Sequence, residues 1–348
     1  MKKIVILLLV ISGAHTGTGT SEATGGSADV PVPAFEVLAD PHFLAGFRII
    51  DPSTRKVCKR VKSAEEGPEP AWAIAQWNTR FNLADTLERR RLPNGGVLFE
   101  DDTKYLEFHH EDGMLVLGLD SMKEYEGKFR DATQGWPHLL VQQTLKTPFL
   151  DQLKSLTLSL EACILAAENI EDPAKGYNPG LHASQFQIFL IVKDDKPDSP
   201  GRHDFYWHGV PVYDSRKPFH EESLHVDFNP DMPQANRRSI YVPATSEYLR
   251  ENGDRHVSAP VGHSACANPR FLTSQEPPTP TRWVRFEADL LPLIQRGLTK
   301  AKAKGALAHS RGTLDAYRIT HINIGWEMPG LANAKGAIRG LSLLGEPQ

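Results

Sequence analysis

Residues 156–164 have the sequence LTLSLEACI, in which apolar and polar side chains alternate. Leu156, Leu158 and Leu160 fall on one side of an extended chain, and Thr157 and Ser159 fall on the other. An alternation with period two is typical of a β-strand that buries one face only. The stretch therefore predicts a strand at the surface of a sheet sandwich.

The same alternation recurs along the chain, with turn residues between the runs. Residues 105–110 and 114–119 flank Glu111-Asp112-Gly113, which predicts a hairpin with its glycine at a positive φ. Together with the first stretch, such runs predict roughly eleven or twelve strands. The other runs lie at 46–50, 72–77, 139–144, 185–192, 205–213, 224–228, 282–288, 319–326 and 338–344.

Helix signals are few. Residues 289–304 carry Asp289 as a possible N-cap, apolar residues at helical spacing, late lysines and Gly305 as a stop. Residues 149–153 and 83–90 favour short helices or helical turns. Many strands with so few helices predict an all-β fold, an antiparallel two-sheet β-sandwich of jelly-roll type with one or two short helices.

Length and composition agree with one large folded domain. The chain has 348 residues, of which 40% are hydrophobic and 24% charged, so a sizeable core is available. Lys2, Lys3 and the apolar run 4–11 predict a signal peptide over 1–14, and hence a secreted or periplasmic protein without a membrane anchor. Residues 15–34 have the composition of a flexible linker, and 35–348 form the predicted β-sandwich domain.

Charge and cysteine content narrow the classes of partner and cofactor. A net charge of −4 gives no electrostatic reason to bind nucleic acid. The three cysteines allow one disulfide at most, between an undetermined pair, so the core must supply the stability. We expect no cofactor and no metal ligands, with calcium left open at the acidic loop 194–198. The oligomeric state is not predicted.

The densest group of polar and aromatic side chains is HDFYWHGVPVYDSR, residues 203–216. In an extended chain Asp204, Tyr206 and His208 point to one face, and Phe205 and Trp207 point to the other. If the polar faces of several strands coincide, they form a surface of planar hydrogen-bonding groups and aromatic rings. Such a surface suits a sugar, whose hydroxyls and C–H faces match these groups. The opposing interpretation makes the tryptophans core residues and the histidines ordinary sheet residues.

Two chemistries on a polysaccharide remain open. Hydrolysis needs two carboxyl groups across the scissile bond, and Glu161, Asp204, Asp227 and Glu327 are separate candidates. Elimination from a uronate needs a group that neutralises the carboxylate and another that moves protons. For elimination we expect the catalytic residues Tyr206, His208, Arg216 and Gln187, and the substrate-binding residues His182, Gln185, Asp204, Trp207, Tyr213, His225 and Asp227.

Residues 182–216 and the ending INIGWEMPG…IRGLSLLG resemble secreted bacterial jelly-roll proteins of the concanavalin A-like type that bind or degrade polysaccharides. The resemblance implies a polysaccharide or oligosaccharide partner. Jelly-roll alginate lyases have a Gln-(Ile/Val)-His strand motif, where this chain has Gln185-Phe186-Gln187. In the lyase hypothesis Gln185, Gln187 and Arg216 bind the uronate carboxylate.

Two further hypotheses stay open beside the lyase. A non-catalytic carbohydrate-binding protein would use Trp207 and Tyr213 to stack on sugars and Asp204 to fix hydroxyls. A structural or envelope protein would instead present its polar strand face to a protein partner.

Overall fold

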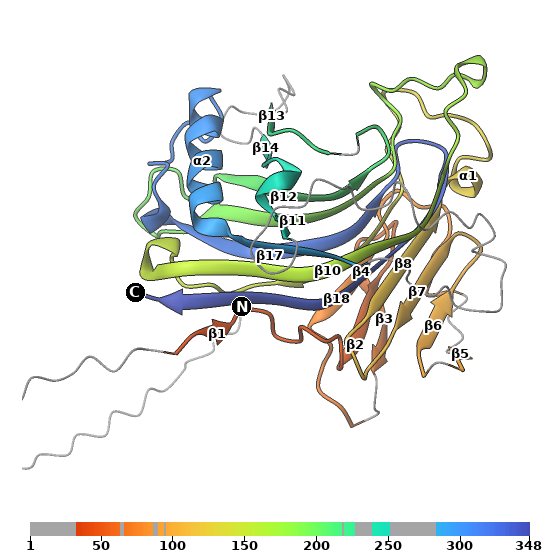
Figure 1. Ribbon diagram of the computed structural model, residues 1–348, viewed down its shortest axis with the longest axis horizontal. Coiled ribbons are helices and arrows are strands. Elements are labelled where there is room, and N and C mark those ends of the chain that lie inside the picture. Colours follow the sequence, from red (N-terminus) through yellow and green to blue (C-terminus); the bar gives the residue numbers. More distant parts are fainter. Residues whose placement is uncertain are drawn as a thin grey trace, which may run out of the picture. The chain divides into compact units, whose positions relative to one another are not determined.

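An antiparallel sheet and a mixed sheet pack face to face in the computed structural model, and Figure 1 shows their strands as two layers. The structure describes residues 33–62, 66–85, 90–93, 95–217, 219–226, 239–250 and 283–348. The predicted signal peptide and residues 15–32 of the predicted linker lie outside them. Within the described part no helix is long and apolar enough to cross a membrane.

Sheet A follows the order β15, β16, β10, β18, β8, β7, β6, β5, with β1 beside β18. Its strands are β15 (Leu249–Arg250), β16 (Val284–Asp289), β10 (Leu153–Asn169), β18 (Ala332–Pro347), β8 (Leu115–Asp120), β7 (Lys104–Phe108), β6 (Val97–Glu100), β5 (Arg90–Arg91) and β1 (Phe35–Glu36).

Sheet B follows the order β13, β14, β12, β11, β17, β9, β4, β2, β3. Its strands are β13 (Ser223–Val226), β14 (Ser239–Val242), β12 (Phe205–Asp214), β11 (Gln185–Asp194), β17 (Tyr317–Glu327), β9 (His138–Thr144), β4 (Trp72–Ala75), β2 (Gly46–Ile50) and β3 (Val57–Lys62). The pairs β12–β14 and β2–β4 are parallel, whereas the other described pairs are antiparallel. The predicted jelly-roll sandwich is confirmed.

The alternation at 156–164 has the predicted consequence. Leu156, Leu158 and Leu160 are buried between the sheets, and Thr157 and Ser159 lie half-buried on the outer face of sheet A. On β11 of the facing sheet, Ile188 and Leu190 supply the opposite side of the same core. Burial of these side chains on both inner faces supplies the main stabilisation, about 1.5–3 kcal/mol for each.

The predicted helix at 289–304 is α2 (Leu290–Ala303). The carboxylate of Asp289 accepts a hydrogen bond from the Leu291 amide at 3.1 Å, so it caps the helix as expected. Ile294 and Leu298 are fully buried, because α2 packs against β10, β12 and β14. The predicted turn at 149–153 is a 3-10 turn over Leu150–Gln152, and α1 (Ser121–Glu124) is one further helical turn.

Of the short helix or helical turn predicted at 83–90, the structure describes residues 83–85 and Arg90. Residues 83–85 form a turn, and Arg90 begins β5. Residues 86–89 lie outside the description.

Candidate functional site

The outer face of sheet B carries a row of polar side chains that runs across four neighbouring strands. Gln185 on β11 pairs in register with Asp214 on β12 and with Glu327 on β17. Glu327 pairs in turn with His138 on β9. The alternate β11 residues Phe186, Ile188 and Leu190 belong to the core, so this row faces away from it. We call Asp214, Gln185, Glu327 and His138 the carboxylate row.

Asp214 is held in place by two neighbours. Arg216 donates Nε to Oδ1 at 2.9 Å and Nη2 to Oδ2 at 2.7 Å, and Gln185 donates Nε2 to Oδ2 at 2.7 Å. Burial alone would raise the pKa of Asp214, but the hydrogen bonds and charge of Arg216 lower the pKa overall. Asp214 is therefore a carboxylate at neutral pH, and its charge is balanced by Arg216.

Glu327 is more open to solvent, with 19% of its side chain exposed. Trp136 donates Nε1 to Oε2 of Glu327 at 3.3 Å, and His138 places Nε2 3.6 Å from Oε1. The rings of Trp136 and His138 stack with centroids 5.6 Å apart. An aromatic pair thus stands beside this carboxyl group.

Farther along the strands, amide and aromatic side chains replace the charged groups. Gln187 follows Gln185 on the same face, and the next position, Phe189, pairs in register with Asn323. Asn323 pairs in turn with Gln142 on β9. We call Gln187, Asn323 and Gln142 the amide group. It lies between the carboxylate row and the far end of the face.

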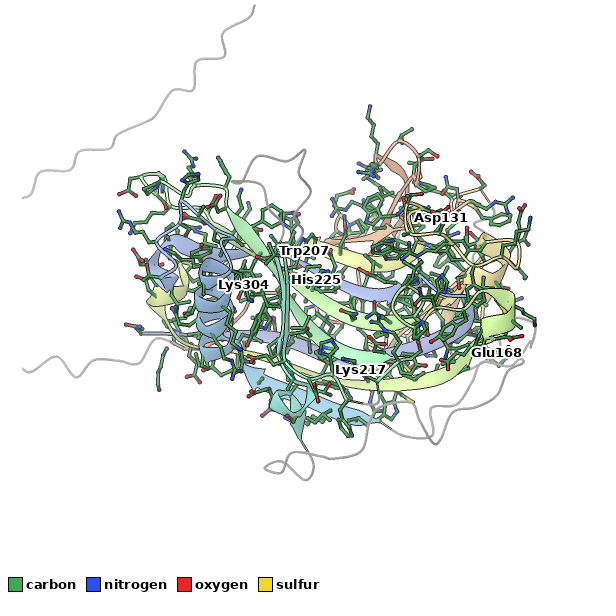
Figure 2. The ribbon with its side chains drawn as sticks, turned by 90° about the horizontal axis from the view of Figure 1, so that it is seen from above. Asp131, Glu168, Trp207, Lys217, His225 and Lys304 are labelled. Atoms are coloured by element: carbon green, nitrogen blue, oxygen red, sulfur yellow. The ribbon has the colours of Figure 1, made fainter. Side chains whose placement is uncertain are left out.

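Trp207 and His225 belong to a further row at that far end. Trp207 pairs with Ile240, and Ile240 pairs with His225, so the register places them on one line across β12, β14 and β13. Figure 2 shows both labelled side chains over these strands. From Gln185 to Ile191, the β11 residue that pairs with Trp207, the face extends for about 20 Å.

The expectation that Tyr206 and His208 face solvent was wrong. Both are fully buried on the inner face of β12, and Phe205 and Trp207 take the outer face. The Tyr206 hydroxyl donates to the Ile294 carbonyl of α2 at 3.1 Å, and His208 Nε2 lies 2.9 Å from the Tyr248 hydroxyl. Because α2 and the turn before β15 supply these polar partners, two polar side chains can be accommodated in the core. Burial also lowers the pKa of His208 to about 3.

Tyr213 likewise belongs to the core rather than to an open face. It is 6% exposed, accepts a hydrogen bond from Asn169 Nδ2 at 3.1 Å, and meets Trp326 edge to face. A β-bulge where Phe186 pairs with Tyr213 and Gln187 pairs with Pro211 adds one residue to β12. The bulge turns Tyr213 inward and Asp214 outward.

Two other predicted binding residues are buried away from the carboxylate row. His182 is 2% exposed and stacks on Phe129 with ring centroids 4.6 Å apart. Asp204 is 6% exposed at the start of β12, where desolvation raises its pKa. Both therefore lie apart from the carboxylate row. Asp227 lies outside the described residues.

The structure thus brings Gln185, Gln187 and Arg216 together near the carboxylate row and places Trp207 and His225 at the far end. Trp136 and His138 are not among the site residues predicted from the sequence. The alternation of His138, Leu140 and Gln142 along β9 is a signal that could have revealed the histidine.

A metal centre is not apparent among the described residues, where no group of three histidine, cysteine or acidic side chains is placed to hold an ion. In the acidic loop 194–198, the calcium candidate from the sequence, Asp194 accepts hydrogen bonds from the Ser199 and Ser310 hydroxyls, at 2.5 and 3.2 Å. These hydroxyls already satisfy Oδ2 of that carboxylate.

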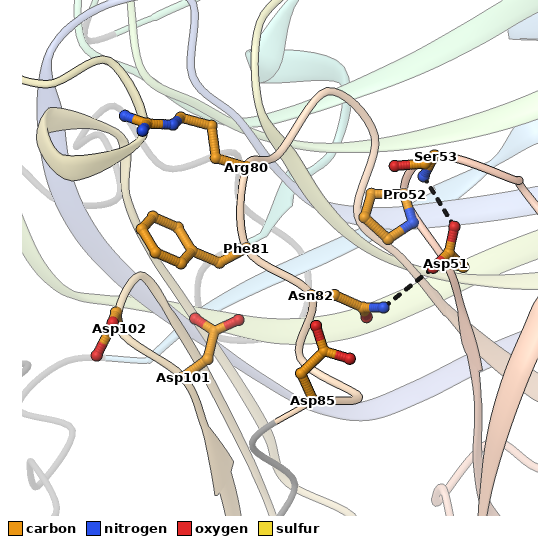
Figure 3. Close-up of a pocket in the computed structure, with 9 residues that line it drawn as sticks. All are labelled: Asp51, Pro52, Ser53, Arg80, Phe81, Asn82, Asp85, Asp101 and Asp102. Atoms are coloured by element: carbon orange, nitrogen blue, oxygen red, sulfur yellow. Dashed lines mark hydrogen bonds between the residues drawn. The ribbon is translucent and has the colours of Figure 1, made fainter.

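A separate acidic pocket of about 350 Å³ lies among the loops at the ends of β2, β4 and β6 (Figure 3). One of its carboxylates, Asp101, is paired with the buried Lys104 Nζ at 3.0 Å. Its lining residues are Asp51, Pro52, Ser53, Arg80, Phe81, Asn82, Asp85, Asp101 and Asp102.

No family model and no curated protein matches the sequence. Solved structures similar to the chain include an endoglucanase Cel12A from Rhodothermus marinus, at 11% identity and a TM-score of 0.37 over 75% of this chain and 97% of that one. A family 12 xyloglucanase from Bacillus licheniformis gives 7% identity and a TM-score of 0.37, over 74% and 97% of the two chains. A family 11 xylanase from Neocallimastix patriciarum gives 7% identity and a TM-score of 0.31, over 78% and 97%.

Proposed function

We propose that the outer face of sheet B binds a polysaccharide and that Glu327 and Asp214 hydrolyse a glycosidic bond of it. The observation that carries the proposal is the register of the carboxylate row, which sets two carboxyl groups on either side of Gln185, with the Trp136 ring beside Glu327. The amide group offers donors and acceptors for sugar hydroxyls, and Trp136 and Trp207 offer flat surfaces for sugar rings. A face about 20 Å long suits a chain of sugars better than a single one.

The chemistry follows from the position of the two carboxyl groups. Their strands are separated by β11, so their backbones lie about 10 Å apart. We propose an inverting mechanism, in which a water molecule lies between the second carboxyl group and the sugar. Glu327 donates a proton to the glycosidic oxygen as the bond between that oxygen and the anomeric carbon breaks. Asp214, which Arg216 keeps ionised, accepts a proton from a water molecule. The oxygen of that water bonds to the anomeric carbon.

Elimination from a uronate is less well supported than hydrolysis. Tyr206 and His208, the expected proton-transfer groups, are fully buried on the opposite side of β12. Arg216 is already paired with Asp214, so its charge is not available for a substrate carboxylate. Since the amide group carries no charge, we propose a neutral polysaccharide as substrate.

The test is an assay of the purified protein with two groups of polymers. Xyloglucan, xylan and hydroxyethylcellulose are the neutral group, and alginate and polygalacturonate are the uronate group. We expect new reducing ends with at least one neutral polymer and no rise in the ultraviolet absorbance of unsaturated uronates. Glu327→Gln should lower the rate by at least about 100-fold, because it removes the proton donor.

Glu346→Gln is the matched control, since Glu346 lies half-exposed on β18 of sheet A. It should leave the rate unchanged. Polymer binding without any release of reducing ends would favour the non-catalytic carbohydrate-binding hypothesis. Absence of binding to every polymer would refute the proposal and favour a protein partner.

A further inference from the structure

One buried arginine, Arg130, connects three of the four chain segments that carry the carboxylate row. Its guanidinium donates Nη1 to the carbonyls of Asp131 and Gln134, both at 2.9 Å. It donates Nη2 to the Leu181 carbonyl at 3.1 Å and Nε to the Pro329 carbonyl at 3.2 Å. Four hydrogen bonds thus reach three segments that are far apart in the sequence.

Each of these segments leads directly to a residue of the proposed site. Residues 131–134 precede Trp136 and His138, Leu181 precedes Gln185 by four positions, and Pro329 follows Glu327 by two. The guanidinium therefore sets how β9, β11 and β17 present their side chains to one another at this end of the sheet. Its planar shape lets one group bind carbonyls in several directions.

The charge of Arg130 is placed unusually for a buried arginine. Arg130 is 7% exposed, and its guanidinium donates its hydrogen bonds to backbone carbonyls. Its charged group lies over the ring of Trp136, 5.0 Å from the centroid. Trp136 is the residue that donates to Glu327, so a cation–π contact fixes this ring in the site.

The backbone of Arg130 is fixed as well. His182 places Nε2 3.0 Å from the Arg130 carbonyl, and its Nδ1 accepts from the Asn178 amide at 2.9 Å. His182, expected from the sequence to bind substrate, therefore supports the loop that holds Arg130.

We infer that Arg130 is a positioning residue of the outer-face site, which holds Trp136 and Glu327 at their working separation. The inference rests on the proposed function for its ligand. Lysine cannot replace arginine here, because an ammonium group has three donors at a single point and cannot reach four carbonyls of three segments.

The experiment compares Arg130→Lys with Arg318→Lys in protein labelled with 5-fluorotryptophan. Arg318 is a matched control, because its guanidinium lies 3.9 Å from the Phe149 ring centroid and donates to the Thr147 carbonyl, at the opposite end of β17. The chain has six tryptophans, and the Trp136 fluorine signal is assigned by its loss in Trp136→Phe. We expect Arg130→Lys to shift the Trp136 signal and lower xyloglucan affinity about tenfold, and Arg318→Lys to do neither.

A Trp136 signal that stays in place in Arg130→Lys would overturn the inference, whatever the wild-type protein binds. A wild-type protein that binds no polymer would instead refute the proposed function. If Arg130→Lys does not fold, His182→Gln is the second variant, because it removes the contact between His182 and the Arg130 carbonyl. It should shift the Trp136 signal by a smaller amount, and an unmoved signal again contradicts the inference.

Discussion

Asp214 and Glu327 are held one strand to either side of Gln185, and each pairs with it in register on the outer face of sheet B. The two carboxyl groups differ in their surroundings. Asp214 is tied to Arg216 and stays ionised, whereas Glu327 is partly exposed beside two aromatic rings. In the proposed function Asp214 is the base and Glu327 is the acid.

Replacing Asp214 by asparagine tests the role of the ionised partner. Asp214→Asn removes the proton acceptor, so we expect hydrolysis to fall by at least about 100-fold. The variant also leaves Arg216 without its carboxylate, which should lower the free energy of unfolding by about 1–2 kcal/mol. Reducing-end assays and urea melts measure the two effects. Unchanged hydrolysis would exclude Asp214 as the base.

Loss of the Trp136 ring should weaken saccharide binding without a large loss of stability. Trp136→Ala removes a flat surface and the donor to Glu327, and we expect at least a tenfold rise in the dissociation constant for xyloglucan. Trp283→Ala is the control, because Trp283 is also half-buried under an arginine, Arg339, at 4.3 Å, but packs on sheet A. Equal effects of both variants on binding, measured by calorimetry, would contradict a site at Trp136.

The buried His208 should make the protein sensitive to acid. Its pKa is about 3 in the folded state, below the ordinary value of 6.5, so the unfolded state binds more protons between these two values. Stability therefore rises with pH in this window, by up to about 1.4 kcal/mol per pH unit from this residue, and is unaffected by it above pH 6.5. Urea melts from pH 4 to 7 should show a shallower dependence for His208→Gln.

His225→Gln is the control for this measurement, since His225 is exposed on β13. A pH dependence that His208→Gln leaves as steep as in the wild type would show that this histidine is not the group responsible.

Gly325 has a backbone conformation that requires glycine. Its φ is +147°, and a Cβ there would lie 2.2 Å from the Leu139 carbonyl oxygen of β9. We expect Gly325→Ala to lower the free energy of unfolding by about 3 kcal/mol. Gly340→Ala, at φ +58° with no atom within 4 Å, should cost about 1–2 kcal/mol. If chemical denaturation gave the two variants a similar loss of unfolding free energy, the backbone near Gly325 would have moved to relieve the contact with the Leu139 carbonyl.

Local pattern was enough to predict the sandwich and its helix. The alternation at 156–164 requires one buried face, and Asp289 with the apolar spacing after it specifies α2, because both signals act between near neighbours in the chain. The net charge and the number of cysteines are likewise known from the sequence without a structure.

The site depended on information that the sequence pattern does not contain. Alternation in β12 separates Tyr206 from Trp207 but does not say which of them faces the core. That choice follows from α2, whose Ile294 carbonyl lies 88 residues away and accepts the Tyr206 hydroxyl. The bulge that turns Asp214 outward, and the register that aligns it with Gln185 and Glu327, likewise arise from pairing between distant segments. Sequence by itself determined which residues alternate, and only the tertiary structure decided which alternate face meets solvent, because burial is set by contacts remote in the chain.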